Sequence, residues 1–130
     1  MSENESKRKT LVGAIHPDVL AFTVGQDPRL DLELVEWDGL GSAAHVTMLS
    51  RMRITPALFS PAEREAVVRE LAAILRLGRA GAFAITAEDQ DVHLAIERHL
   101  TEQLGDLGRR IHTGRSRNDQ VAVDLRLHAR

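Results

Sequence analysis

A polar run from His112 to Gln120 contains the residues best suited to bind a charged ligand. It sets two guanidinium groups, two hydroxyls, an imidazole and two side-chain amides around one glycine. Arginine side chains, loop N–H groups and the N-terminus of a following helix all favour a carboxylate or a phosphate. The run suits a metal poorly, because its groups are mainly donors and cations and no His or Cys pair stands at ligand spacing. A well-capped loop with solvated arginines is the alternative interpretation.

His93 is the second candidate, because it stands on the apolar face of a predicted helix with Asp89 and Glu97 four residues away on either side. At that spacing either carboxylate could contact the imidazole, fix its tautomer and raise its pKa. The competing interpretation is a half-buried structural histidine between two capping acids, which periodicity alone favours. His45, in an earlier helix, carries the same ambiguity.

The elements that position these residues are predicted to be helices with short connections. A short helix at 17–22 precedes breaks at Gly25 and Pro28, and a longer helix spans about 30–52. Its expected apolar stripe consists of Leu30, Leu34, Trp37, Gly41, Met48 and Met52.

Two capping boxes predict where the next helices begin. The box 60–63 opens a helix that Gly78 and Gly81 end, and its core face is expected to contain Val67, Leu71, Ile74 and Leu75. The box 86–89 opens a helix to about Leu104, which Gly105 stops. A polar loop at 108–117 then leads to a last helix from about 120, with caps available at Ser116, Asn118 and Asp119.

Composition excludes several classes of protein. The 130 residues carry 17 Lys and Arg against 19 Asp and Glu, so a formal net charge of -2 argues against a nucleic acid or an anionic membrane as partner. A 43% hydrophobic and 28% charged composition is that of one globular domain. The absence of cysteine excludes disulfides, thiolate nucleophiles and cysteine metal sites, and is compatible with a cytoplasmic location.

The string from His112 to Gln120 resembles the signature of argininosuccinate lyases, in the fumarase and aspartase superfamily. The resemblance extends to residues 88–97 and 38–49, and covers roughly 20–130. It implies a mainly α fold: residues 13–118 as the small N-terminal lyase domain, after a disordered tail at 1–12. Residues 119–130 would begin a helix leading into a central helix bundle that this sequence does not contain.

The resemblance also implies a reaction, the cleavage of argininosuccinate to arginine and fumarate by elimination in arginine biosynthesis. The implied enzyme is a cytoplasmic homotetramer that needs no metal or organic cofactor, and its small-molecule substrate is argininosuccinate. Its active site combines three regions from different subunits, of which this chain supplies the first. We therefore expect the 130 residues alone to be inactive, because the family's general base lies in a later region.

Site roles follow from the same resemblance, position by position. His93 is expected to support the site from a neighbouring helix. Whether Thr23 or Asp27 replaces a substrate-contacting serine found in many family members stays open. The expected substrate-binding residues are Arg115, Ser116, Arg117 and Asn118, and the expected loop-shaping residues are His112, Thr113, Gly114, Asp119 and Gln120.

Two alternatives remain open at this point. The chain could be a non-catalytic interaction or structural module with the lyase fold, as in the avian lens delta-crystallins, because a fold does not guarantee an activity. It could also belong to a lyase for another N-succinyl substrate. Because the last helix leads, in the family, into the central bundle, we expect its apolar residues Val121, Val123, Leu125 and Leu127 to stay uncovered here and to promote self-association.

Overall fold

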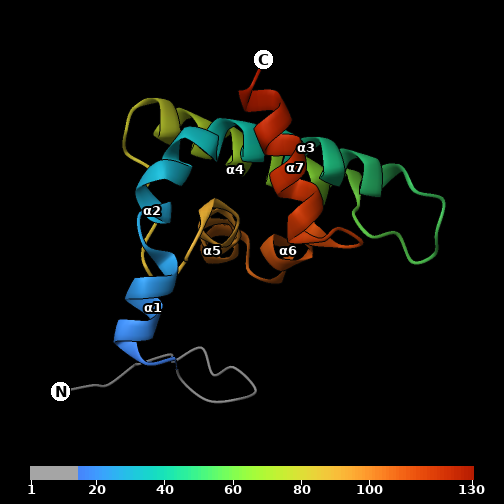
Figure 1. The fold of residues 1–130 in the computed structure, drawn as a ribbon. Coiled ribbons are helices and arrows are strands. Elements are labelled where there is room, and N and C mark those ends of the chain that lie inside the picture. Colours follow the sequence, from blue (N-terminus) through green and yellow to red (C-terminus); the bar gives the residue numbers. More distant parts are fainter. Residues whose placement is uncertain (1–14) are drawn as a thin grey trace.

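The computed structural model describes residues 15–130, and within them the chain forms helices and no strand. Figure 1 shows their arrangement. The expected tail at 1–12 lies outside the described residues. The elements are α1 (Pro17–Val24), α2 (Asp27–Leu30), the 3₁₀ turn η1 (Asp31–Leu34), α3 (Val35–Arg51), α4 (Pro61–Arg79), α5 (Val92–Leu104), α6 (Asp106–Arg109), the 3₁₀ turn η2 (Arg110–His112) and α7 (Arg117–His128).

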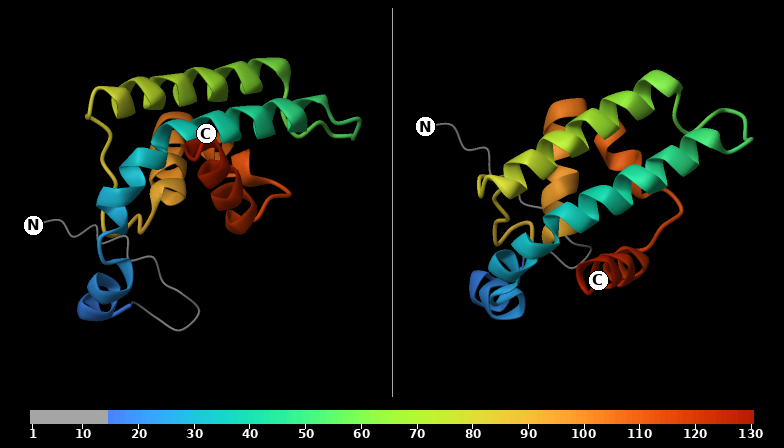
Figure 2. Two further views of the ribbon diagram at one scale, coloured as in Figure 1. Left: turned by 45° about the horizontal axis from the view of Figure 1, so that its top comes forward. Right: turned by 90° about the horizontal axis from the view of Figure 1, so that it is seen from above.

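The long helices α3 and α4 lie side by side and run in opposite directions, as the views in Figure 2 show. Helix α5 packs against both, and α7 lies across α3. The apolar core lies between α3, α4 and α5. Helix α3 therefore faces the core along one side and contacts α7 along another. Its buried members are Val35, Val46, Leu49, Phe59, Val67, Leu71, Ile74, Phe83, Val92, Ala95, Ile96, Leu100 and Ile111.

The predicted capping box at Ser60 is confirmed. The backbone N–H of Ser60 donates to Glu63 Oε2 at 2.8 Å, and the N–H of Glu63 donates to Ser60 Oγ at 3.2 Å. The helix that follows buries Val67, Leu71 and Ile74 as expected, while Leu75 is half-buried. Gly105 ends α5, as predicted.

The prediction that a helix begins after Thr86 is wrong. Thr86 and Asp89 do exchange the two hydrogen bonds of a capping box, at 2.9 and 3.3 Å, but they close only a turn. Gln90 then adopts a φ of 70°, which no α-helix contains, so the helix cannot propagate from that turn. Helix α5 begins instead at Val92, with Asp91 as its N-cap.

The stripe predicted for residues 30–52 is also wrong. Leu30, Met48 and Met52 are 53, 49 and 45% exposed. The 3₁₀ turn η1 interrupts the stretch, so Leu30 does not share the helical phase of α3. Met48 lies within α3 but off its buried face. The buried face of α3 consists of Val35, Asp38, Gly39, Ser42, Val46 and Leu49.

The polar segment at 108–117 contains the end of α6 and the turn η2, so it is more ordered than the loop that we predicted. Helix α7 begins at Arg117, and the expected boundary between 118 and 119 falls within its first turn. This helix buries Gln120 and Asp124 and leaves Val123 and Leu125 exposed. The buried part of the contact between α7 and α3 is therefore polar, and the half-exposed Val123 lies beside it, near Gly41.

Over residues 15–130, no helix has the length and apolar character needed to cross a membrane.

Candidate active site

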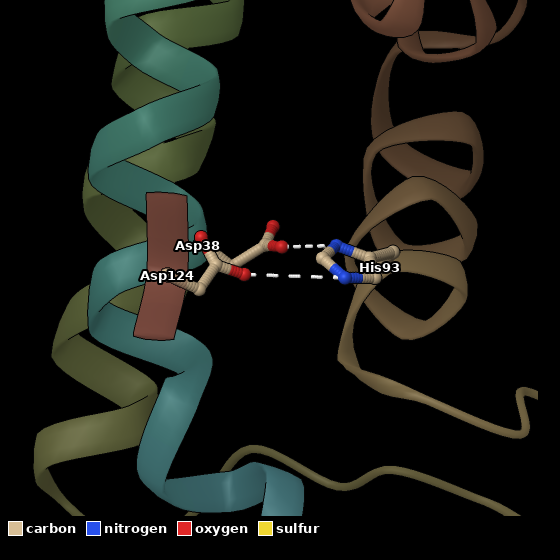
Figure 3. A group of neighbouring side chains, drawn as sticks. All are labelled: Asp38, His93 and Asp124. Carbon is tan, nitrogen blue, oxygen red and sulfur yellow. Dashed lines mark ion pairs between the residues drawn. The ribbon is translucent and has the colours of Figure 1, made fainter. Parts of the chain in front are cut away.

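Three buried side chains from three helices meet at His93. Asp38 comes from α3, His93 from α5 and Asp124 from α7, and Figure 3 shows both carboxylates pointing at the imidazole. Nδ1 of His93 pairs with Oδ2 of Asp38, and Nε2 lies 3.9 Å from Oδ2 of Asp124. His93 is therefore a buried polar junction between helices, as its position on an apolar face indicated.

The two carboxyl groups of this junction differ in charge. Burial raises the pKa of Asp38, but its contact with His93 outweighs burial and holds that pKa below the ordinary value. Burial, together with the negative charge of Asp38, raises the pKa of Asp124 to about 9. At neutral pH Asp38 is therefore ionised and Asp124 holds a proton, because two adjacent buried carboxylates cannot both be charged cheaply.

The structure does not place the expected partners, Asp89 and Glu97, against His93. Asp89 binds Arg98 through two hydrogen bonds of 2.8 and 3.0 Å. Glu97 lies 3.9 Å from Nε2 of His112. Because α5 begins at Val92, Asp89 precedes the helix and does not share its face with His93.

The sequence reasoning missed Asp38 and Asp124 as site residues. One signal was available for Asp38, because it follows Val35 by three residues and precedes Ser42 by four, on what is the buried face of α3. For Asp124 the corresponding signal is Gln120, four residues earlier on the buried face of α7.

The three side chains at this junction also carry nitrogen and oxygen atoms that could bind a cation. Asp38, His93 and Asp124 each offer one ligand atom within 4.8 Å of the others. His93, however, turns a different ring nitrogen toward each carboxylate, so a single ion could not replace both contacts. We therefore interpret the group as a buried polar junction that connects α3, α5 and α7.

The loop between η2 and α7 is fixed at both ends. Gly114 adopts a φ of 71°, and the carbonyl of Thr113 lies 2.8 Å from Nε2 of His45 on α3. Ser116 caps α7: its Oγ accepts the N–H of Asn118 at 3.0 Å, and its own N–H donates to Asp119 Oδ2 at 3.0 Å. The caps that we predicted for this helix are thus confirmed at Ser116 and Asp119.

Gln120 and Arg115 connect this loop to the buried junction. Nε2 of Gln120 donates to the carbonyl of Asp38 at 3.1 Å and approaches Oγ of Ser42 at 3.4 Å. Nη2 of Arg115 approaches the same hydroxyl at 3.3 Å. Arg115, which we expected to bind substrate, therefore turns part of its guanidinium inward, whereas Arg117 is exposed on the first turn of α7.

Two cavities of about 180 Å³ each meet at Arg117. One is lined by Thr23, Asp27 and Asp91, so both candidates for the missing serine lie along it. Nη1 of Arg117 is 3.0 Å from Oδ2 of Asp91.

The other cavity is lined by His93, Glu97, His112, Arg115, Arg117 and Gln120, together with Leu94. It brings His93 and the polar run of residues 112–120 to one site, which spacing alone did not establish. Two arginines face one glutamate there, so the cavity favours an anionic group.

A family model described as lyase matches residues 30–130. The chain belongs to this lyase family, and its helical architecture agrees with the fold expected for it. The chain is 42% identical over all 130 residues to an argininosuccinate lyase of Trichormus variabilis, covering 27% of that protein. It is 44% identical over 116 residues, 89% of this chain, to an argininosuccinate lyase of Phocaeicola vulgatus, covering 25% of that protein.

A third relative, the argininosuccinate lyase of Synechocystis, is 44% identical over 118 residues, which is 91% of this chain and 24% of the relative. The chain thus spans about a quarter of the length of the curated relatives that it matches.

Proposed function

We propose that this chain supplies the first active-site region of an argininosuccinate lyase, which cleaves argininosuccinate to arginine and fumarate in arginine biosynthesis. The observation that carries the proposal is the cavity shared by His93, Arg115 and Arg117, in a chain 42% identical over its full length to a relative of that name. We further propose a cytoplasmic homotetramer as the working form of the enzyme.

The chemistry of the cavity supports this reaction. Elimination beside a carboxylate builds up negative charge on that carboxylate, so catalysis needs cations and N–H donors that are already in place. Arg117 is assigned to a substrate carboxylate, because it lies on the first turn of α7, at the positive end of that helix dipole.

The roles of the neighbouring residues are proposals too. Ser116 Oγ already accepts a backbone N–H, which leaves its own O–H proton for a substrate oxygen. Asn118 is exposed beside it and is assigned to polar groups of the substrate. His93 supports the site by holding α3, α5 and α7 together, rather than by contacting the reacting atoms.

A chimera tests the proposal. This chain would replace the matching segment of the Trichormus variabilis relative, and fumarate release from argininosuccinate would be followed by ultraviolet absorbance. We expect turnover by this Trichormus chimera and none by the 130-residue chain alone, since we assign the general base to a region outside these residues. A folded chimera that is inactive on argininosuccinate would favour the non-catalytic module, and activity on a different N-succinyl compound would change the substrate.

A further inference from the structure

His112 and Arg115 make a contact that only one neutral tautomer of the imidazole allows. Nη2 of Arg115 lies 2.7 Å from Nδ1 of His112. A guanidinium has donors and no acceptor, so Nδ1 must be the acceptor and carry no proton. The ring proton of His112 is therefore on Nε2.

The surroundings of His112 keep its imidazole neutral. Burial, and next the positive charge of Arg115, lower the pKa of His112 to about 4. Asp38 opposes this shift, while His93 and His45 add to it. At physiological pH, His112 thus has one donor, in a fixed position, and no net charge.

The Nε2–H of His112 faces the cavity that we assign to substrate. Nε2 lies 3.9 Å from Oε2 of Glu97, which is beyond hydrogen-bond distance, and the two side chains are 25 and 28% exposed. Both line the cavity of about 180 Å³, together with Arg117. The lining of this cavity thus offers an N–H donor, a guanidinium and a carboxylate.

This pairing of groups suits a ligand that carries a carboxylate beside an ammonium. The carboxylate would accept from the Nε2–H of His112, and the ammonium would donate to Glu97. Arg117, where this cavity meets its neighbour, stays assigned to a succinyl carboxylate. A plain dicarboxylate would meet the same N–H donor, but it would also meet the negative charge of Glu97. Argininosuccinate has both kinds of end: an α-amino acid on its arginine side and two carboxylates on its succinyl side.

We propose that His112, held by Arg115 as the Nε2–H tautomer, binds the α-amino-acid end of the substrate in this cavity, together with Glu97. The inference rests on the proposed function and names which end of argininosuccinate enters here. His112 and Glu97 would contact substrate, and Arg115 is a positioning residue that acts through His112.

Nuclear magnetic resonance of the 130-residue chain with labelled histidine rings tests the tautomer. At pH 6.5 we expect the ring nitrogens of His112 to show the neutral Nε2–H form. Arg115→Met should release the ring, so that the pKa of His112 rises from about 4 toward the ordinary value, although burial still lowers it, and the ring exchanges between tautomers. Arg109→Met, at an exposed arginine that pairs with Asp106, should change neither property. A charged His112, or an Nδ1–H form, at pH 6.5 in the unmodified chain overturns the proposal.

Titration with arginine and with succinate tests the ligand. Arginine should move the His112 signals at a concentration about tenfold below that needed for succinate. The ammonium of arginine gains a charge-assisted contact with Glu97, whereas a carboxylate of succinate is repelled by it. His112→Asn keeps an acceptor for Arg115 but loses the outer donor, so it should weaken arginine binding about tenfold. His112→Gln places an N–H near the position of Nε2 and should restore most of the loss. Arginine that moves no His112 signal, or a preference for succinate, overturns the proposal.

The Trichormus chimera separates this inference from the proposed function. A chimera that cleaves argininosuccinate equally well with and without His112→Asn, in both KM and kcat, refutes the inference and leaves the function. An inactive chimera, with arginine still bound at His112 in the chain, refutes the function and leaves the amino-acid site.

Discussion

One carboxylate oxygen of Asp91 lies 3.0 Å from Nη1 of Arg117, while the other accepts the backbone N–H of Leu94 at 2.9 Å. A single side chain therefore caps the start of α5 and holds the guanidinium on the first turn of α7. The two contacts connect helix formation to the orientation of the arginine that we assign to a substrate carboxylate.

The two roles of Asp91 can be separated by substitution. Asparagine caps helices as well as aspartate does, so Asp91→Asn should lower the free energy of unfolding by less than about 1 kcal/mol, the usual size of an exposed ion pair. Asp91→Ala should cost about 1 kcal/mol more, because the cap is lost as well. Denaturant titration of the chain measures both. Equal losses in the two variants would show that the ion pair, and not the cap, stabilises this helix start.

Arg117→Ala should separate function from stability. Its side chain is half-exposed and pairs with Asp91 near the surface, so the melting temperature of the chain should change little. In the Trichormus chimera the same substitution should lower kcat/KM for argininosuccinate by about 100-fold or more, the usual effect of removing a donor to developing charge. Arg109→Ala is the matched control. An active but unstable Arg117 variant would mean that this arginine is a structural clamp.

Asp124 should make the stability of the chain fall as pH rises. Its pKa is raised to about 9 by burial and by Asp38, from an ordinary value of 3.8, so between these values the folded state binds a proton that the unfolded state has released. Its contribution is complete below about pH 4 and is lost as the pH rises through 9. Asp124→Asn should therefore flatten the decline of the free energy of unfolding between pH 5 and 9. An unchanged pH profile in Asp124→Asn would show that this carboxyl group is ionised in the folded state.

Gly108 should tolerate no side chain, because a Cβ there would lie 2.5 Å from the backbone C of Leu100 and 2.5 Å from the backbone N of Thr101. Backbone cannot move aside locally, so Gly108→Ala should cost about 1–3 kcal/mol. Gly39→Ala is the comparison, since its Cβ would meet only the flexible end of Leu75. Denaturant titration of both variants measures the difference. A Gly108 variant as stable as the Gly39 variant would show that α6 can slide along α5.

The chain should self-associate in solution. Val123 and Leu125 on α7 are 44 and 53% exposed, and Phe22 on α1 is 90% exposed. Exposed apolar surface of several hundred Å² commonly drives association. Light scattering over a concentration series should show a rising mass, and Leu125→Glu should reduce the rise. A strictly monomeric chain at high concentration would contradict this expectation.

Local signals in the sequence determined several helix boundaries and the position of the polar run that we propose to bind substrate. The capping boxes at Ser60 and Ser116 and the stop at Gly105 are satisfied by bonds between residues four or fewer positions apart, so neighbouring residues alone specify them. The polar string from His112 to Gln120 pointed to one site for the same reason, because its residues are adjacent in the chain.

Only the tertiary structure decided which side chains meet His93. Asp89 and Glu97 satisfied every local rule for partners of His93, yet Asp38 and Asp124 occupy those places from two other helices. Spacing describes contacts along one helix, and here a φ of 70° at Gln90 separates Asp89 from α5, the helix that contains His93. The burial that raises the pKa of Asp124 arises only when α3, α5 and α7 pack together, because desolvation depends on every element around a charge and not on its neighbours in sequence.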